Sequence, residues 1–382
     1  MKSIYLKEEH ILLQKMVKEF SENEVKPIAS EIDSTSQFPK KTIKKMSELG
    51  LMGIPWDEKY GGAGLDTMAF VIAIEELAKV CASTAITMTA HTSLGTAPIA
   101  AFGTNEQKEK YLPDLASGKK LGAFGLTEPN AGSDAGNTST KAILDGDSYL
   151  VNGQKAFCTN AGFADIIIFT AVIVEGGVEK GIGAFIVESG AEGLRLGEPE
   201  KKMGWKASDT RSIFFNDMKI PKKNILGSPS KGFKQFLKTL TGGRIAIGAL
   251  SVGTAVGAYN IALNYSKERK AFGKEINKFQ GVSFKLSDMA TSIEASRELI
   301  YKAAWMKDGN LPVIKNAAMA KLFASETAMQ VTTEAIQILG GYGYIKEYNA
   351  ERFFRDAKIL EIGEGTSEIQ RIIISREILN SI

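Results

Sequence analysis

The sequence predicts an α+β fold built from three consecutive lobes, which are a helical lobe, a β lobe and a helical bundle. Three observations lead to this prediction. Apolar residues recur at helical spacing from Glu8 to about Gly118, short apolar runs bounded by turn signals replace them to about Gly227, and long helical periods return after Gly232. A chain of 382 residues is also longer than one hydrophobic core usually supports. We therefore expect three domains, residues 1–118, 119–227 and 228–382.

The first lobe shows its helical period in residues 11–20, where the apolar residues Ile11, Leu12, Met16, Val17 and Phe20 recur at helical spacing. A glycine-rich run at residues 60–64 interrupts the pattern. Residues 103–106 (Gly-Thr-Asn-Glu) carry the residue types that cap a helix start. We therefore expect a helix to begin there.

The middle lobe contains the dipeptide Asn152-Gly153, which favours a two-residue hairpin turn. The segments Tyr149–Val151 and Gln154–Cys158 flank it and are expected to be the two strands of a hairpin. Further turn signals lie at residues 145–147 and 176–177, and further strands are expected at Ile166–Val174 and Ile182–Val187.

The last lobe contains one stretch, Ile245–Leu263, of 19 residues without a charge, between Arg244 and Lys267. Its length would allow it to span a membrane. Its many glycine, serine and threonine residues are poor for lipid contact and good for close helix packing. We therefore expect a buried helix and no membrane segment.

Composition narrows the possible functions. The 47 Lys and Arg residues exceed the 44 Asp and Glu residues by only 3, which gives no support for nucleic-acid binding and leaves a phosphorylated small molecule possible. The two cysteines, Cys81 and Cys158, have no metal or disulfide spacing, and two histidines are too few for a histidine-rich metal site. With no signal-peptide pattern at the start, we expect a cytoplasmic protein without a metal centre.

Two segments of the β lobe carry residues suited to ligand binding. The loop at residues 121–134 offers hydroxyls at Thr127 and Ser133 and free backbone N–H groups for an anionic ligand, or it is a plain turn after a strand. At the end of a later strand, Phe157 and Thr159 should share one face because side chains alternate along a strand. That face suits a planar heterocycle, or it holds one core aromatic and one strand threonine.

Two segments of the last lobe are also candidates. Arg269 precedes Phe272 and leads to Phe279-Gln280, so its guanidinium could hold a diphosphate or be a solvated helix-end charge. The run at residues 337–344 is rich in glycine and either lets a ligand approach the backbone or ends a helix.

The segment Glu361–Arg371 places a carboxylate, Glu364, just before an expected helix. Ser367 and Gln370 fit a capping box, so the helix should begin at Ser367. Taken alone, a loop carboxylate is usually solvated.

Together these segments resemble the acyl-CoA dehydrogenase family over essentially the whole chain and in the same order. The stretches 125–134, 337–341 and 355–371 (RDAKILEIGEGTSEIQR) are specific to it, and the short-chain, butyryl-CoA-like branch is most similar. The resemblance implies a homotetramer with a helical N-terminal domain, a middle β domain and a C-terminal four-helix bundle. It also implies that FAD and an acyl-CoA are bound, and that electrons pass to an electron-transferring flavoprotein.

The resemblance also implies roles for individual residues. Glu364 matches the base that removes the α proton while the β hydrogen leaves as hydride to N5 of the flavin, near Thr159. Burial beside an acyl chain should raise the pKa of Glu364 towards neutrality. Other branches carry the base at the position of Gly243, where glycine cannot serve. Implied FAD contacts are Phe124, Leu126, Thr127, Phe157, Thr159, Arg269, Phe272, Gln280, Gln337, Gly340, Gly341, Thr366 and Glu368, and implied substrate contacts are Ser133, Thr241, Arg244, Gly363 and Gly365.

Two positions depart from the short-chain pattern. A tyrosine usually precedes the base, whereas Gly363 stands here, as in the isovaleryl-CoA branch, which suggests room for a branched or arylpropionyl group. A neighbouring side chain could instead fill that space. Thr241 stands where an aspartate that contacts CoA is common, which puts that contact in doubt.

Three other functions fit the same resemblance. An enoyl-CoA reductase would run the same chemistry in reverse with electrons from a flavoprotein partner, and an acyl-CoA oxidase would reduce dioxygen. A non-catalytic flavoprotein that binds nucleic acid would need a basic groove, which the scattered lysines do not indicate.

Overall fold

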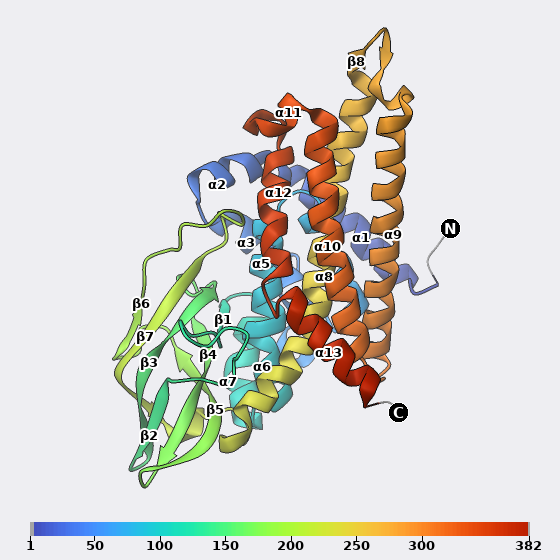
Figure 1. Ribbon diagram of the computed structural model, residues 1–382. Coiled ribbons are helices and arrows are strands. Elements are labelled where there is room, and N and C mark those ends of the chain that lie inside the picture. Colours follow the sequence, from blue (N-terminus) through green and yellow to red (C-terminus); the bar gives the residue numbers. More distant parts are fainter. Residues whose placement is uncertain (1–3, 381–382) are drawn as a thin grey trace.

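The computed structural model describes residues 4–380 and has the three lobes in the predicted order (Figure 1). The first lobe is helical, and its central helices α4 and α5 are buried along their whole length. Thr104 caps α7, because its hydroxyl accepts the N–H of Gln107 at 3.2 Å and its own N–H donates to the Gln107 side chain at 3.0 Å, which confirms the predicted helix start. The helices are α1 (Glu8–Phe20), α2 (Ala29–Thr35), α3 (Lys40–Glu48), α4 (Thr67–Ala78), α5 (Ala82–Ala90), α6 (Ala97–Phe102) and α7 (Asn105–Ala116).

The middle lobe is one mixed sheet in the order β1-β4-β2-β3-β7-β6, with β5 on the other edge of β4. β1 and β2 lie end to end along β4 and run parallel to it, whereas the remaining neighbours are antiparallel. The strands are β1 (Gly122–Gly125), β2 (Lys141–Asp145), β3 (Ser148–Thr159), β4 (Ile166–Glu175), β5 (Val178–Glu188), β6 (Leu194–Leu196) and β7 (Thr210–Pro221).

The hairpin predicted at Asn152-Gly153 is wrong, because both residues lie inside the continuous strand β3. The register with β7 shifts between Val151 and Gly153, so the pair forms a β-bulge. The Asn152 side chain exchanges two 2.9 Å hydrogen bonds with Asp217 on β7, and Gly153 has φ +142°. Gly153 therefore has a positive φ because it lies in a bulge, and not because it lies in a turn.

The third lobe is a bundle around the 37-residue helix α8. Glycines on α8 allow close packing, since a β-carbon at Gly253 would lie 2.4 Å from the carbonyl oxygen of Glu75 on α4. Within residues 4–380, one helix, Pro229–Glu268, is long and apolar enough to cross a membrane, and 78% of its apolar window is buried in the protein, as expected for Ile245–Leu263. The elements are α8 (Gly232–Glu268), β8 (Lys270–Ala271), β9 (Lys274–Glu275), α9 (Gln280–Asp308), α10 (Ile314–Leu339), α11 (Gly341–Tyr344), α12 (Ala350–Lys358) and α13 (Ser367–Leu379).

Short π or 3₁₀ turns connect the longer elements. The π turn η5 connects α5 to α6, and its residue Leu94 lines the cavity described below. These turns are η1 (Ser21–Val25), η2 (Lys26–Ile28), η3 (Leu51–Gly53), η4 (Glu58–Tyr60), η5 (His91–Thr96), η6 (Lys222–Asn224), η7 (Pro229–Lys231), η8 (Ile276–Lys278), η9 (Lys346–Tyr348) and η10 (Ile359–Glu361).

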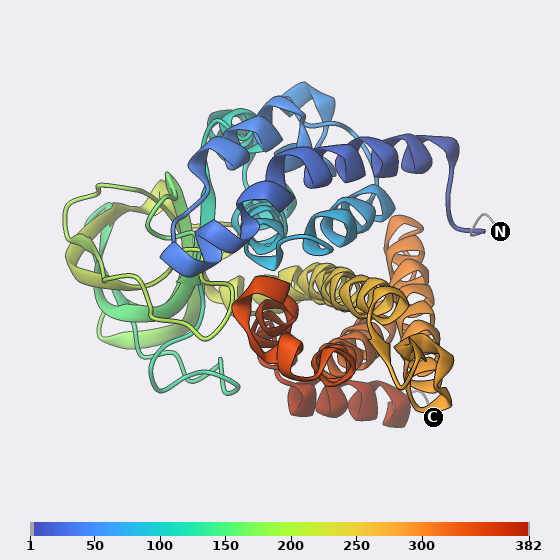
Figure 2. The ribbon, with the colours of Figure 1, turned by 90° about the horizontal axis from the view of Figure 1, so that it is seen from above.

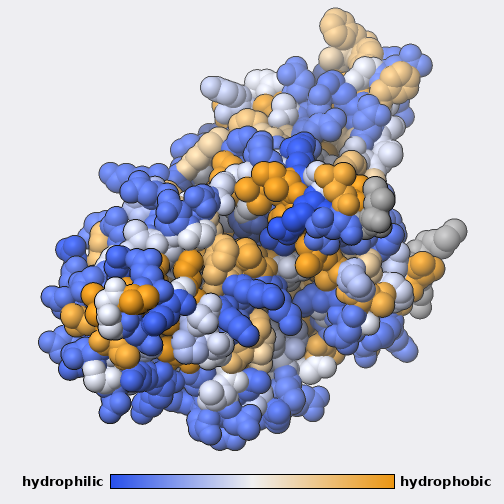
Figure 3. Space-filling view, turned by 60° about the horizontal axis from the view of Figure 1, so that its bottom comes forward, coloured by the Kyte–Doolittle hydropathy of each residue, from blue (hydrophilic) through white to orange (hydrophobic). Residues whose placement is uncertain are grey.

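The two helical lobes share one hydrophobic core, whereas the sheet has its own. Figure 2 shows this division, with the β lobe at one side and the N-terminal helices lying across the C-terminal bundle at the other. In the space-filling view, hydrophilic residues cover most of one face and apolar residues form separate patches (Figure 3). A third cluster, which includes Leu112 of α7, Ile168 of β4 and Phe236 of α8, packs the sheet against both helical lobes.

Candidate active site

A cavity of about 2030 Å³ lies where the three lobes meet. Its wall includes residues of α5 and η5, the loop after β1, the end of β3, α8, and the segment from η10 to α13. Cavities for one small ligand usually measure about 300–1,000 Å³. The cavity therefore has room for two ligands side by side.

Glu364 points its side chain into this cavity from the loop between η10 and α13. Both of its carboxylate oxygens are buried and have no hydrogen-bond partner among the described residues. Burial raises the pKa of Glu364 to about 7, and the positive charges of Arg244 and Lys321 act in the opposite direction. A buried, unpartnered carboxyl that titrates near neutrality is a candidate for proton transfer.

The loop that carries Glu364 has an unusual backbone. Glu364 has φ +53° and Gly365 has φ +95°, so two consecutive residues lie in the left-handed region. The Gln370 amide donates to the carbonyl oxygens of Glu364 at 3.2 Å and of Gly365 at 2.8 Å. The Lys321 ammonium donates to the same Gly365 oxygen at 2.9 Å.

The predicted capping box is wrong by one residue. Helix α13 does begin at Ser367, but Thr366 is the N-cap, and its hydroxyl accepts the N–H of Ile369 at 3.3 Å. Gln370 does not cap the helix because its amide is bonded to the loop carbonyls. Within this segment, the capping side chain and the loop-binding side chain are therefore different residues.

One wall of the cavity comes from the β lobe. Phe157 has φ +56° and lies where the β3–β7 register shifts, between Lys155 and Cys158. Its ring is 67% exposed and lines the cavity together with Thr159, so both side chains face the same space as predicted. The other residues predicted on this wall, Phe124, Leu126 and Thr127, also line the cavity.

A buried ion pair that sequence reasoning missed holds this wall. The Lys155 ammonium lies 2.7 Å from the Glu128 carboxylate, and both side chains are almost fully buried. Lys155 also bonds Thr170, while Glu128 accepts N–H bonds from Ser139 and Thr140. The pair therefore fixes both ends of the loop between β1 and β2. The available signal was a lysine inside an expected strand, directly before Ala156 and Phe157.

The predicted substrate residues Ser133, Thr241, Arg244, Gly363 and Gly365 all line the same cavity. Arg244 is 5% exposed, and its Nε atom is buried without a partner. Its Nη1 atom lies 3.5 Å from the Thr241 hydroxyl. Further cationic side chains in the wall include Lys201, Lys202, Lys231, Lys234, Lys238 and Arg376, so the cavity is suited to a phosphorylated ligand.

The remaining predicted residues lie elsewhere, except Thr366, which lines the main cavity. Arg269, Gly340 and Gly341 line a second, open cavity of about 450 Å³ together with Tyr342, whose ring lies 5.7 Å from the Arg269 guanidinium. Phe272 is 96% exposed between β8 and β9. Within one chain, the residues that do not line the main cavity are Arg269, Phe272, Gln280, Gln337, Gly340, Gly341 and Glu368.

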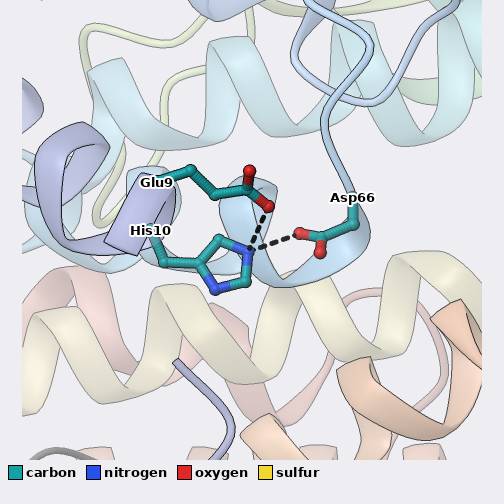
Figure 4. A group of neighbouring side chains, drawn as sticks. All are labelled: Glu9, His10 and Asp66. Carbon is teal, nitrogen blue, oxygen red and sulfur yellow. Dashed lines mark hydrogen bonds and ion pairs between the residues drawn. The ribbon is translucent and has the colours of Figure 1, made fainter. Parts of the chain in front are cut away.

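A separate group formed by Glu9, His10 and Asp66 has ligand atoms close enough to hold a metal ion (Figure 4). His10 Nδ1 accepts the N–H of Lys7 at 3.1 Å, and His10 Nε2 lies 2.9 Å from Asp66. The Lys7 ammonium lies 3.1 Å from the same carboxylate, and Asp66 also caps α4. Because a cation already neutralises Asp66, we interpret the group as a link between α1 and α4.

Comparisons with known proteins agree with this geometry. Family models described as the N-terminal, middle and C-terminal domains of acyl-CoA dehydrogenase match residues 7–119, 123–218 and 230–379. A short-chain specific acyl-CoA dehydrogenase of Clostridium acetobutylicum is 52% identical over 98% of each chain. The solved butyryl-CoA dehydrogenase of Megasphaera elsdenii is 46% identical, with a TM-score of 0.95 over 98% of this chain and 99% of that one.

A second solved structure, described as the electron-transferring flavoprotein of Acidaminococcus fermentans, contains a chain that is 47% identical, with a TM-score of 0.95 over 98% of both chains. All three domains and the full length are thus shared with these relatives. The chain belongs to the acyl-CoA dehydrogenase family.

Proposed function

We propose that this chain removes two hydrogens from the α and β carbons of a short acyl-CoA thioester and that Glu364 takes the α proton. The class of reaction follows from family membership, and the named relatives act on short-chain thioesters. The observation that supports the role of Glu364 is its buried carboxylate, which has no partner and faces the cavity between the lobes. No other carboxylate is proposed for this step.

The environment of Glu364 suits a base. A C–H bond beside a thioester is weakly acidic, so the base needs a pKa near the working pH and a fixed position. Burial supplies the raised pKa of about 7, and two helix-borne side chains, Lys321 and Gln370, fix the loop. Arg244 keeps positive charge near the carboxylate, which favours its ionised form.

The β-lobe wall fits FAD, the cofactor of the family. The exposed Phe157 ring offers a face for a planar heterocycle, and Thr159 offers a hydroxyl beside it. Leu126 and Thr127 line the same space. When bound, FAD accepts the hydride that leaves the β carbon. We propose Phe124, Leu126, Thr127, Phe157 and Thr159 as its contacts on this wall.

The other half of the cofactor site is proposed to come from a second subunit of a homotetramer. Phe272 is almost fully exposed at a hairpin tip, and the cavity beside Arg269 is open, as expected for surfaces that meet another chain. The Arg269 guanidinium, already placed over the Tyr342 ring, suits a diphosphate. The residues assigned to this half are Arg269, Phe272, Gln280, Gln337, Gly340 and Gly341, while Thr366 and Glu368 are proposed to close the cofactor site.

The acyl pocket is proposed to accept a branched or arylpropionyl group. A β-carbon at Gly363 would meet only the Ile359 carbonyl oxygen, at 3.4 Å, so the described residues leave the space beside it open. Ser133, Thr241, Arg244 and Gly365 are proposed to contact the CoA end. Oxidation in the cytoplasm, with an electron-transferring flavoprotein as acceptor, completes the proposal, supported by the Acidaminococcus fermentans structure.

The test is an anaerobic titration of the purified yellow protein with butyryl-, isovaleryl-, isocaproyl- and phenylpropionyl-CoA. Bleaching of the flavin bands reports oxidation directly. We expect faster bleaching by the branched or aryl thioesters, and loss of bleaching with retained colour in Glu364→Gln. Bleaching by butyryl-CoA alone would remove the pocket proposal, and an unimpaired Glu364→Gln would remove the base.

A further inference from the structure

Lys321 lies in the middle of α10 and is fully buried. A buried lysine is costly unless its ammonium is well bonded. Its Nζ atom donates to the Gly365 carbonyl oxygen at 2.9 Å, across 44 positions of sequence. The α10 backbone at Lys321 lies against α8, because a β-carbon at Gly248 would lie 3.7 Å from the Lys321 Cα atom. The side chain therefore reaches from the bundle core to the loop of the proposed base.

That loop needs outside support. Non-glycine residues with positive φ are strained and persist only when neighbouring groups hold them. Glu364 has φ +53°, and the two carbonyl groups that this backbone turns inward are held by Gln370 from α13 and Lys321 from α10. Gln370 contacts both carbonyls, whereas Lys321 is the charged donor. Two different helices thus define where the carboxylate points.

We propose that Lys321 is a positioning residue for Glu364, holding the Gly365 carbonyl and supplying a buried positive charge that favours the ionised carboxylate. This inference rests on the proposed role of Glu364 as the base. Lys321 would act only through Glu364 and would not contact the substrate.

The charges around Lys321 are consistent with this role. Burial lowers the pKa of Lys321 to about 8, while the carboxylates of Glu364, Glu361 and Glu326 raise it and Arg244 lowers it. At pH 7 the side chain is therefore mostly an ammonium ion. Around Glu364, burial acts against ionisation, and the charges of Arg244 and Lys321 act for it. Removing one of these two cations should shift the Glu364 pKa upwards.

The test compares three substitutions in the FAD-loaded enzyme. Lys321→Met removes charge and donor, Lys321→Gln keeps a donor without charge, and Lys321→Arg keeps both. The control is Thr332→Val, which removes a fully buried hydroxyl three turns further along the same face of α10 and leaves the loop untouched. The readouts are the pH profiles of kcat and KM, and hydrogen exchange of the amides at residues 363–366.

For Lys321→Met we expect the acid limb of kcat to move up by roughly one pH unit, kcat at pH 7 to fall roughly fivefold, and KM to stay within about twofold. Loop amides should exchange faster. Lys321→Gln should move the acid limb of kcat in the same direction, with a smaller increase in the hydrogen-exchange rate of the loop amides. Lys321→Arg should leave the acid limb where it lies in the unmodified enzyme. Thr332→Val should change neither readout.

An unchanged acid limb in Lys321→Gln, together with unchanged loop exchange in Lys321→Met, would overturn the proposal. If Lys321→Met does not bind FAD, the acid limb of Lys321→Gln decides alone. Failure of the proposed function is distinguishable, because the unmodified enzyme would then bleach with none of the acyl-CoA thioesters.

Discussion

The carboxylate of Glu364 occupies the space that a side chain at Gly243 would need. A β-carbon at position 243 would lie 1.8 Å from Oε2 and 2.8 Å from Cδ of Glu364. The proposed base and position 243, where the family resemblance places the base in other branches, therefore compete for one place in this fold. Glycine on α8 is what admits a carboxylate from the C-terminal loop.

Gly243→Ala is expected to displace the proposed base. The methyl group would overlap the carboxylate, and a displacement of about 1 Å can lower kcat roughly 100-fold. Flavin absorbance should remain, since residue 243 does not line the wall assigned to FAD. Gly242→Ala is the matched control, because its β-carbon would meet its nearest neighbour, Lys307, at 3.5 Å. Equal kcat values for the two variants would contradict the prediction.

Glu364→Gln should change the pH dependence of stability. The pKa of Glu364 is raised from 4.5 to about 7, so the folded protein binds an extra proton between these values. The stability that this proton contributes is present at low pH and is lost as pH rises towards 7. The glutamine variant lacks this loss, worth up to about 3 kcal/mol. Its Tm should therefore exceed that of the unmodified protein more at pH 8 than at pH 5.

Calorimetry at both pH values checks this expectation. Burial also raises the pKa of Asp356 to about 7, so Asp356 lowers the stability of both proteins as pH rises. This effect is the same in the unmodified protein and in Glu364→Gln, and it cancels in the difference between their Tm values. A constant Tm difference between pH 5 and pH 8 would show that Glu364 does not titrate in this range.

Gly363→Tyr should narrow the acyl pocket. A side chain at this position would extend into open space next to the proposed base. We expect kcat/KM for isovaleryl-CoA to fall at least about tenfold while butyryl-CoA is still oxidised. Gly363→Ala should give an intermediate ratio. Parallel losses for both substrates would mean that the glycine does not select for branching.

Lys155→Met should be strongly destabilising. It leaves the Glu128 carboxylate buried without its cation, which typically costs about 3–5 kcal/mol. The double variant Lys155→Met/Glu128→Gln should recover part of this loss. Lys110→Met, which removes an exposed partner of Glu188, should cost at most about 1 kcal/mol. Thermal unfolding of the four proteins tests the prediction, and similar losses at Lys155 and Lys110 would refute it.

Sequence patterns predicted the features that depend on residues close together in the chain. The three lobes, the buried helix at Ile245–Leu263 and the helix start after Thr104 follow from periodicity and capping, and the structure has all of them. The Asn152-Gly153 turn failed because a positive φ serves a bulge as well as a turn, and only the Asp217 side chain on a distant strand selects between them.

Support for the candidate site could not be predicted from local patterns. Glu364 was found because its whole segment resembles a known one, whereas Lys321 is one lysine among many in helical segments. Its role depends on which face of α10 is buried and on a contact 44 positions away. Lys155 and Glu128 are likewise joined only by the folded sheet.

The left-handed backbone at Glu364 has an evolutionary consequence. Asparagine and glycine adopt φ +53° more easily than glutamate, so selection for stability alone would replace Glu364 with one of them. A mutational scan scored for protein abundance should therefore favour these residues at position 364, while a scan scored for activity should reject them. Opposite preferences at one position would indicate a residue that is retained for catalysis although it lowers the stability of the fold.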